Sequence, residues 1–221
     1  MYKGILFIIL ISTMSFINQS RTKVVFFGDS ITEMGVREGG YIYQIDSICK
    51  AEGKADRFEF AGAGIGGNKV YDLYLRMEKD VLSKNPDVVV IYIGVNDVWH
   101  KQIAGTGTDP DKFVKFYDAI IEKLKAKGIK VILCTPAVIG EKTDFSNQQD
   151  GDLNAYSSLI REIAAKHQLP LVNLRQLFLD YNLKHNPENK ESGILTTDRV
   201  HLNYKGNQLV ALELWNVLQK Y

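Results

Sequence analysis

The chain has 221 residues, of which 45% are hydrophobic and 24% charged, a composition typical of one globular domain with a sizeable core. Lysine and arginine number 27 against 26 aspartate and glutamate residues, and no basic block occurs, so the charge pattern gives no reason to expect nucleic acid or an anionic membrane surface as the partner. The expected partner is a small molecule.

Residues 1–20 differ from the rest of the chain. Lys3 precedes the apolar stretch "GILFIILISTMSFI", which is shorter than the roughly 20 residues that cross a bilayer but typical of a secretory signal. We expect residues 1–20 to be a signal peptide, with Ser20 as a cleavage candidate, and residues 21–221 to form the exported domain, secreted or periplasmic and without stable membrane association. An uncleaved anchor and a buried first helix are the alternatives. No cysteine follows the run, so a lipoprotein anchor is not expected.

Short apolar runs alternate with stretches of helical periodicity from residue 23 onward. We expect strands at 23–28, 57–62, 87–94, 129–136 and 169–174, because these runs are nearly continuous in Val, Ile, Leu and Phe. Helical spacing is found in the sets Val70, Leu73, Met77, Val81; Phe113, Phe116, Ile120, Leu124; and Val210, Leu214, Leu218, the last preceded by Asn203 as N-cap. The alternation predicts an α/β domain with a five-stranded parallel sheet covered by helices on both faces.

Two further features bear on structure. The polar stretch "EKTDFSNQQDGD", residues 141–152, has no periodicity and is expected to be a surface loop that flanks a site. Cys49 and Cys134 are the two cysteines, and Cys134 lies within "VILCTP". We expect a buried, inert thiol there, and neither a zinc cluster nor a disulfide framework.

Glycine and polar residues follow three of the expected strands. "GDS" ends the first, "GAGIGGN" follows the second and "GVND" follows the third. Open α/β sheets bind their ligands beyond the carboxyl ends of parallel strands, so these three segments are expected to meet at one site.

Ser30 has two interpretations. With Glu33 it has the S-x-x-E spacing of a capping box, in which the hydroxyl accepts from the first helical turn. The alternative is a nucleophile, which requires a base and an orienting carboxylate elsewhere.

"TTDRVHLN", residues 196–203, supplies both groups. Asp198 and His201 are three residues apart, which brings their side chains to one face of a turn or helical start, although a surface Asp–His pair fits the same spacing. Asp97 and His100 form the internal rival. His167 has no acidic residue within a helical turn, and His185 has Glu188 nearby but lies in a polar, Pro-containing stretch that is expected to be an exposed loop.

Charge that develops on a carbonyl oxygen during acyl transfer needs hydrogen-bond donors. The glycine run offers the backbone N–H of Gly67 or Gly64, and "GVND" offers the side-chain amide of Asn96. Alone, the glycine run also fits a tight turn or a phosphate cradle, and Asn96–Asp97 fits a turn or helix cap.

Together, "GDSIT", "AGAGIGG", "GVND" and "DRVH" resemble the four blocks of the SGNH hydrolase family, also called GDSL-like lipases and acylhydrolases, in order and rough spacing over residues 24–205. The resemblance implies a flavodoxin-like three-layer α/β/α fold without metal or organic cofactor. Ser30 matches the nucleophile and first oxyanion donor, Gly67 the second donor and Asn96 the third. Asp198 and His201 match the remaining triad members.

The match has departures. Gly62 stands where the family's second block usually has Asn, which leaves Gly64 as a rival to Gly67. The first block has Ile31 where the family has Leu. The G-x-S-x-G elbow is missing, which disfavours the other serine-hydrolase fold.

The sequence therefore predicts a secreted serine esterase that hydrolyses carboxylic esters through a Ser–His–Asp triad and an acyl-enzyme, with short acyl groups such as acetyl on carbohydrate as substrate. Expected substrate contacts are Asp29, Gly64, Ile65, Val95 and Trp99, and Val98 is a further candidate for the acyl pocket. The alternatives are a lysophospholipase or thioesterase, a metal-dependent phosphoesterase with Asp29, Asn96, Asp97 and His201 as ligands, and a non-catalytic carbohydrate-binding module. The oligomeric state is left open.

Overall fold

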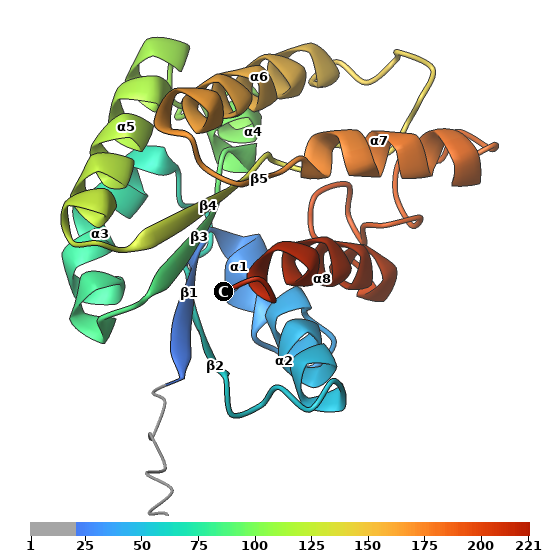
Figure 1. Cartoon of the computed structure of the whole chain (residues 1–221). Coiled ribbons are helices and arrows are strands. Elements are labelled where there is room, and N and C mark those ends of the chain that lie inside the picture. Colours follow the sequence, from blue (N-terminus) through green and yellow to red (C-terminus); the bar gives the residue numbers. More distant parts are fainter. Residues whose placement is uncertain (1–20) are drawn as a thin grey trace, which may run out of the picture.

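A computed structural model describes residues 21–221, and the expected signal peptide lies outside the described residues. Five parallel strands form one sheet in the order β2-β1-β3-β4-β5 (Figure 1). The strands are β1 (Thr22–Gly28), β2 (Phe58–Gly64), β3 (Val88–Tyr92), β4 (Lys130–Cys134) and β5 (Leu171–Val172). The strand order reverses direction at β1, between β2 and β3, so the carboxyl ends of these three strands open onto one crevice.

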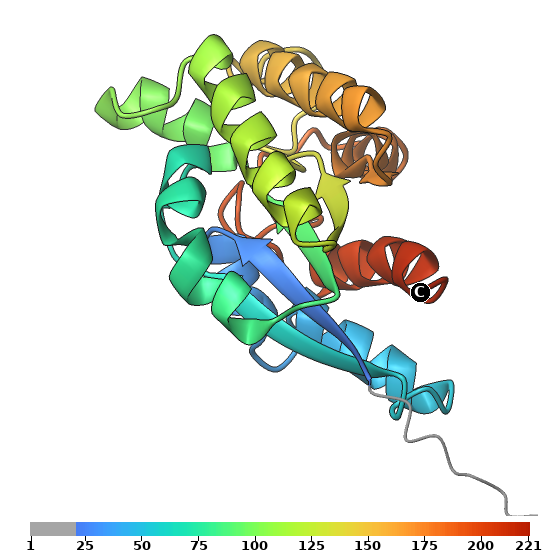
Figure 2. The ribbon, with the colours of Figure 1, turned by 60° about the vertical axis from the view of Figure 1, so that its left-hand side comes forward.

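Helices cover both faces of the sheet (Figures 1 and 2). On one face α3 packs against α5, and α5 against α6; on the other, α2 packs against α8. The helices are α1 (Ser30–Gly35), α2 (Tyr41–Ala51), α3 (Val70–Asp80), α4 (Val95–Ala104), α5 (Pro110–Ala126), α6 (Asp150–His167), α7 (Leu174–His185) and α8 (Tyr204–Leu218), with a short 3₁₀ helix, η1 (Leu82–Lys84). The predicted three-layer α/β fold is thus confirmed. No helix within residues 21–221 is long and apolar enough to cross a membrane.

Burial on both faces explains the composition of the central strands. Every residue of β3 is buried, as is β1 from Val24 to Gly28, so neither strand alternates apolar with polar residues. α5 begins with Pro110 at its first turn and buries Phe113, Ile120 and Leu124, whereas the expected Phe116 is only partly buried. In α8 the Asn203 side chain accepts from Gly206 N at 3.0 Å, as an N-cap should.

The stretch expected as a surface loop departs from that prediction at both ends. Its last three residues form the first turn of α6, which begins at Asp150. Its first residue, Glu141, is buried at 1% exposure. Cys134 is buried, as expected, and Cys49 is buried as well; both are free, and burial raises the pKa of both thiols.

Candidate active site

Ser30 lies at the turn from β1 into α1. The helix is capped by Asp29, whose side chain accepts from Ile31 N at 3.0 Å, and α1 begins at Ser30 itself. Glu33 does not close a capping box with Ser30, because its carboxylate accepts from Gly66 N at 2.7 Å instead. Capping therefore does not occupy the Ser30 hydroxyl, which remains free for another partner.

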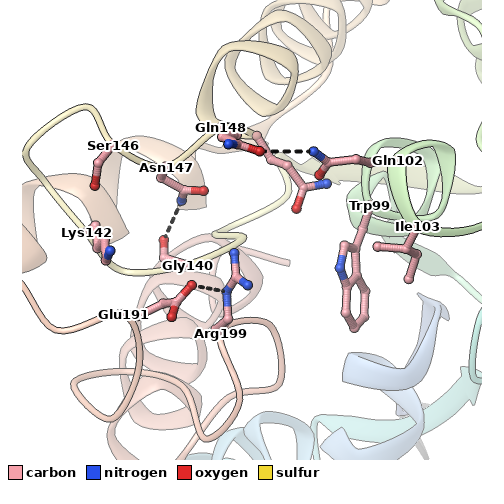
Figure 3. A pocket seen from close by; sticks show the side chains of 11 residues that line it. Trp99, Gln102, Ile103, Gly140, Lys142, Ser146, Asn147, Gln148, Glu191 and Arg199 are labelled. Carbon is pink, nitrogen blue, oxygen red and sulfur yellow. Dashed lines mark hydrogen bonds and ion pairs between the residues drawn. The ribbon is translucent and has the colours of Figure 1, made fainter.

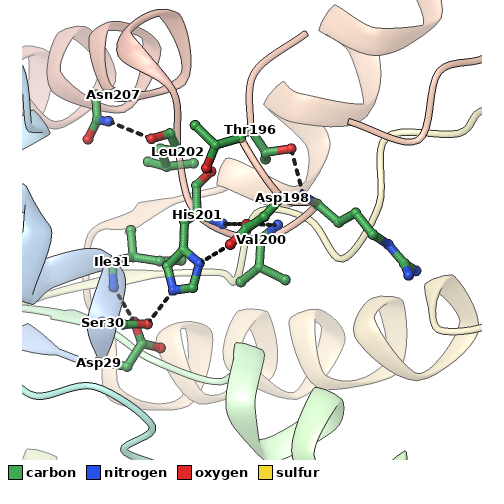
Figure 4. Close-up of polar contacts among 11 residues, drawn as sticks. Asp29, Ser30, Ile31, Thr196, Asp198, Val200, His201, Leu202 and Asn207 are labelled. Carbon is green, nitrogen blue, oxygen red and sulfur yellow. Dashed lines mark hydrogen bonds and ion pairs between the residues drawn. The ribbon is translucent and has the colours of Figure 1, made fainter. Parts of the chain in front are cut away.

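That partner is His201, although 171 positions separate the two residues (Figure 4). Ser30 Oγ lies 2.9 Å from His201 Nε2, and His201 Nδ1 lies 2.6 Å from Asp198 Oδ2. With the imidazole proton on Nδ1, His201 donates to Asp198 and accepts from the Ser30 hydroxyl. The arrangement can move the Ser30 proton onto the imidazole while the carboxylate stabilises the resulting cation.

An irregular loop, and not a helix, brings Asp198 and His201 together. Asp198 Oδ1 accepts from Val200 N at 3.1 Å and from His201 N at 2.8 Å, so the side chain folds back on its own turn. Arg199 between them has φ +86°, a left-handed conformation that is uncommon outside glycine. Thr197 N donates to His201 O at 2.8 Å and closes the loop.

The environment of Asp198 favours its charged form. Partial burial raises the pKa of Asp198, but the His201 ring and the N–H groups of His201 and Val200 lower it more, so the pKa lies below its ordinary value. The carboxylate is consequently ionised at neutral pH, as a group that stabilises an imidazolium must be.

The glycine-rich loop after β2 packs directly against the start of α1. A Cβ on Gly64 would lie 2.0 Å from Glu33 N, and a Cβ on Gly62 would lie 2.5 Å from Val36 Cγ1. These close contacts leave no room for a side chain at either position, which explains why both residues are glycine and why Gly62 replaces the family's usual Asn. A Cβ on Gly66 would lie 3.9 Å from Ser30 Cβ, which places the loop beside the hydroxyl.

Gly67 has a different requirement from Gly64, because its φ of +75° is the left-handed conformation that glycine adopts freely. Its neighbour Asn68 accepts, through its carbonyl oxygen, from Asn96 Nδ2 at 3.1 Å. Asn96 lies in the first turn of α4, directly after β3. The three predicted oxyanion donors, Ser30, Gly67 and Asn96, thus come from three strand ends that meet at one edge of the sheet.

The residues predicted to contact substrate fall into two groups. Ile65 is 46% exposed, and its N–H donates at 3.3 Å to the carbonyl oxygen of Gly28, two residues before Ser30; Trp99 is half-buried and lies three residues after Asn96. Asp29 and Val95 are each only 1% exposed, and Val98 is also buried. These three side chains expose little surface, and Asp29 caps α1, so their contact with a substrate stays a prediction.

Asp29 and Asp97 are buried carboxylates that influence each other. The pKa of Asp29 is raised to about 7, mainly by burial and further by the Asp97 charge. The hydrogen bond from Ile31 N lowers the pKa and offsets part of this rise. Burial also raises the pKa of Asp97 to about 6, and the nearby Thr108 side chain and the hydrogen bond from Val70 N offset part of that rise. Both groups therefore hold protons more tightly than exposed aspartates.

The rival pair Asp97–His100 is organised differently from Asp198–His201. Asp97 Oδ1 accepts from Val70 N at 3.2 Å, which ties α4 to the start of α3. Burial, with the nearby Lys69 charge, lowers the pKa of His100. Within residues 21–221, no three His, Cys, Asp or Glu side chains are grouped in a way that holds a metal ion.

Two charged residues near the site, the partly buried Arg76 and the buried Glu141, gave no sequence signal. Arg76 donates to the carbonyl oxygens of Gly28 and Ala63, and Glu141 accepts from three successive N–H groups in residues 194–196. Arg76 lies four residues before Asp80 and resembles a solvated helix pair, and Glu141 lies in a polar stretch. Only the long-range contacts identify them.

Known proteins resemble this chain over the range that contains these site residues. The model of the GDSL-like Lipase/Acylhydrolase family matches residues 26–209. An acetylxylan esterase of Geobacillus stearothermophilus is 30% identical over 87% of this chain and 91% of its own length. The uncharacterized lipoprotein YqeF of Bacillus subtilis is 26% identical over 93% of each chain. The crystal structure of the acetyl xylan esterase AlAXEase superimposes with a TM-score of 0.87 and 64% identity, over 89% of this chain and 99% of that one.

Proposed function

The chain belongs to the GDSL-like lipase/acylhydrolase family and is a carboxylic ester hydrolase, and from this premise we propose that it is an exported esterase that removes acetyl groups from carbohydrate through an acyl-enzyme on Ser30. The observation that carries the proposal is the hydrogen-bond chain from Ser30 Oγ through His201 to Asp198, with contacts of 2.9 and 2.6 Å. The acetyl-carbohydrate substrate is inferred from the names of the acetylxylan esterases that the chain resembles.

In the first half-reaction Ser30 Oγ attacks the acetyl carbonyl carbon while His201 Nε2 takes the hydroxyl proton. The carbonyl oxygen becomes an oxyanion that accepts from the N–H groups of Ser30 and Gly67 and from Asn96 Nδ2. When the carbon–oxygen bond to the sugar breaks, His201 gives its proton to the departing sugar oxygen, and the acetyl group remains on Ser30.

Water completes the cycle. His201 Nε2 takes a proton from the water, whose oxygen attacks the acetyl carbon to form a second oxyanion. Collapse of this intermediate breaks the bond to Ser30 Oγ, His201 returns the proton to that oxygen, and acetate leaves. Asp198 keeps its charge throughout and orients the imidazole through Nδ1.

The test combines a label with a substrate series. A serine-directed fluorophosphonate should modify Ser30 and stop activity, a chelator should not, and Ser30→Ala should lower kcat by about 10⁴-fold or more while the protein stays folded. p-Nitrophenyl esters from acetyl to palmitoyl, assayed beside acetylated xylan, should show highest kcat/KM for acetyl. Full activity of Ser30→Ala would refute the mechanism, and a preference for long acyl chains would refute the substrate.

Export has a separate test. The apolar leader and Lys3 motivate the proposal that residues 1–20 are cleaved. Expression of the full chain followed by N-terminal sequencing should find a mature protein that begins near Arg21 outside the cytoplasm. Recovery of intact residues 1–20 on a membrane-bound protein would instead identify an anchor.

A further inference from the structure

A polar pocket lies beside the loop that carries Asp198 and His201 (Figure 3). Its walls come from α4, from the loop between β4 and α6, and from the segment between α7 and α8. The lining includes Trp99, Gln102, Lys142, Gln148, Glu191 and Arg199. The volume of about 310 Å³ is at the lower end of the range for small-molecule sites.

Two walls of the pocket adjoin the proposed catalytic groups. Trp99 is three residues after Asn96 on α4, so both side chains occupy the same side of that helix. Arg199 lies between Asp198 and His201, and its carbonyl oxygen accepts from Gly140 N at 2.8 Å. A ligand in this pocket therefore lies beside the helix that carries Asn96 and the loop that carries Asp198 and His201.

The lining suits a ligand rich in hydroxyl groups. Gln102 Nε2 and Gln148 Oε1 face each other at 3.5 Å, and Glu191 Oε1 lies 3.0 Å from Arg199 Nε, so amide, carboxylate and guanidinium groups all line the pocket (Figure 3). Amides and carboxylates both accept hydrogen bonds, and amides and guanidinium groups both donate them, as neighbouring sugar hydroxyls require. The half-buried indole of Trp99 adds a flat apolar surface for the C–H face of a ring.

We propose that this pocket binds neutral pyranose units of a polysaccharide main chain next to the acetylated one. The proposal rests on the proposed function, because it says where the sugar units beside the acetylated one are bound. It also gives a reason for the left-handed backbone of Arg199, which turns that side chain toward the pocket while Asp198 and His201 face Ser30.

The test uses a double variant that leaves the proposed catalytic loop intact. Gln102→Ala with Lys142→Ala should lower kcat/KM for acetylated xylooligosaccharides about tenfold, mainly through KM, because two side-chain partners are lost. p-Nitrophenyl acetate carries no sugar, so its hydrolysis should change less than about twofold. The matched control is Gln176→Ala with Lys101→Ala, two exposed residues whose ion-pair or hydrogen-bond partners lie outside the pocket. Equal losses on both substrates, or no loss on either, would overturn the proposal.

A binding experiment separates this proposal from the proposed function. Titration of Ser30→Ala protein with acetyl-free xylohexaose should show binding that Trp99→Ala or the double variant weakens at least tenfold. If wild-type protein releases no acetate from xylooligosaccharide but this binding holds, the substrate assignment fails and the pocket stands. If acetate is released and binding is indifferent to the pocket variants, the pocket assignment fails alone.

A second, independent observation concerns Arg76, whose guanidinium group connects all the segments that carry the oxyanion donors. Nη2 donates to Gly28 O at 2.8 Å and to Ala63 O at 2.9 Å, at the ends of β1 and β2. Nε donates to Asn68 Oδ1 at 2.6 Å, and the Asn68 carbonyl accepts from Asn96. The group also lies 4.6 Å from the Phe27 ring centre.

We infer that Arg76 is a positioning residue for the oxyanion donors. Gly28 is two residues before Ser30, and Asn68 follows Gly67, so one planar group fixes both backbone donors relative to each other. Asp80 Oδ2 accepts from Nη1 at 2.9 Å and holds the guanidinium in this plane. Lysine carries the same charge but cannot span these acceptors with a fixed fork.

Arg76→Lys should lower kcat about tenfold or more with little change in KM, because small displacements of catalytic donors are costly. Arg175→Lys is the matched control, since Arg175 is another little-exposed arginine that pairs with an aspartate, Asp150 at 2.6 Å, and donates to a backbone carbonyl, Ala137 O at 3.4 Å, but contacts none of the segments that carry the proposed oxyanion donors. It should reduce thermal stability and leave kcat on p-nitrophenyl acetate unchanged. Guanidinium ion well below denaturing concentration should restore part of kcat to Arg76→Ala.

A merely structural role predicts a different outcome. Arg76→Lys would then lose stability as Arg175→Lys does and keep its kcat, and added guanidinium would restore nothing. Asn68→Ala removes only the Nε contact, so it tests the same point if both Arg76 variants fail to fold. Unchanged kcat in folded Arg76→Lys or, failing that, in Asn68→Ala would overturn the inference.

Discussion

Asn96→Ala isolates one proposed oxyanion donor. Asn96 is buried, and Nδ2 uses one hydrogen on the Asn68 carbonyl at 3.1 Å, which leaves the second for the substrate oxygen. Loss of a single oxyanion donor costs about 3 kcal/mol in the transition state, so kcat should fall roughly 10²-fold while KM changes little. Loss of the bond to Asn68 should also lower the free energy of unfolding by about 1 kcal/mol.

The assay is steady-state hydrolysis of p-nitrophenyl acetate, with thermal unfolding of each variant measured by circular dichroism. Asn182→Ala is the control, because Asn182 is equally buried but lies in α7, away from the Ser30 turn. It should lose stability and keep its kcat. If folded Asn96→Ala retains kcat within about threefold of the wild type, Asn96 stabilises no oxyanion and the donor assignment is refuted.

Three further predictions concern the acid, the glycines and pH. Asp198→Asn should lower kcat by about two to four orders of magnitude, because the amide no longer stabilises the imidazolium on His201; a loss under tenfold would contradict this role. Gly67→Ala should lower the free energy of unfolding by about 1 kcal/mol, because Gly67 has a φ of +75°. Gly64→Ala should prevent stable folding, because its Cβ would lie 2.0 Å from Glu33 N. Equal melting temperatures of the two variants would contradict this distinction. The raised pKa of Asp29, about 7 against an ordinary 3.8, means that the folded state holds this proton more tightly, so its contribution to stability is complete below pH 3.8 and is lost as pH rises through about 7. Asp29→Asn should therefore flatten the fall in urea-unfolding stability over that pH window, and an unchanged slope would show that Asp29 is not its source.

Local pattern predicted the fold well because burial on both faces leaves a continuous apolar signal. The run 87–94 predicted β3 (Val88–Tyr92), and the spacing of Val210, Leu214 and Leu218 predicted α8. The last strand was less well predicted, since β5 is an edge strand of only Leu171–Val172. Pro170 before it has no N–H to extend the pairing, although its carbonyl accepts from Leu133 N.

The parts of the candidate site that depend on short, local motifs were predictable from the sequence. The parts that depend on contacts between distant segments were not. The Asp198–His201 spacing is local, and the structure places their side chains 2.6 Å apart. Spacing alone could not separate Gly64 from Gly67, because both belong to one glycine run. Their different environments, a steric contact with α1 and a left-handed φ, exist only after β2 and α1 pack together.

The loop that carries the proposed acid and base depends on two sets of contacts with different effects. The Asp198–His201 distance is set locally, because Asp198 also accepts from the N–H groups of Val200 and His201. Glu141 acts outside this turn, because its buried carboxylate accepts from the N–H groups of residues 194–196 and holds the segment that leads into the loop. Because the two sets share no bond, loss of the Glu141 carboxylate should displace imidazole and carboxylate together from Ser30, with their own contact retained.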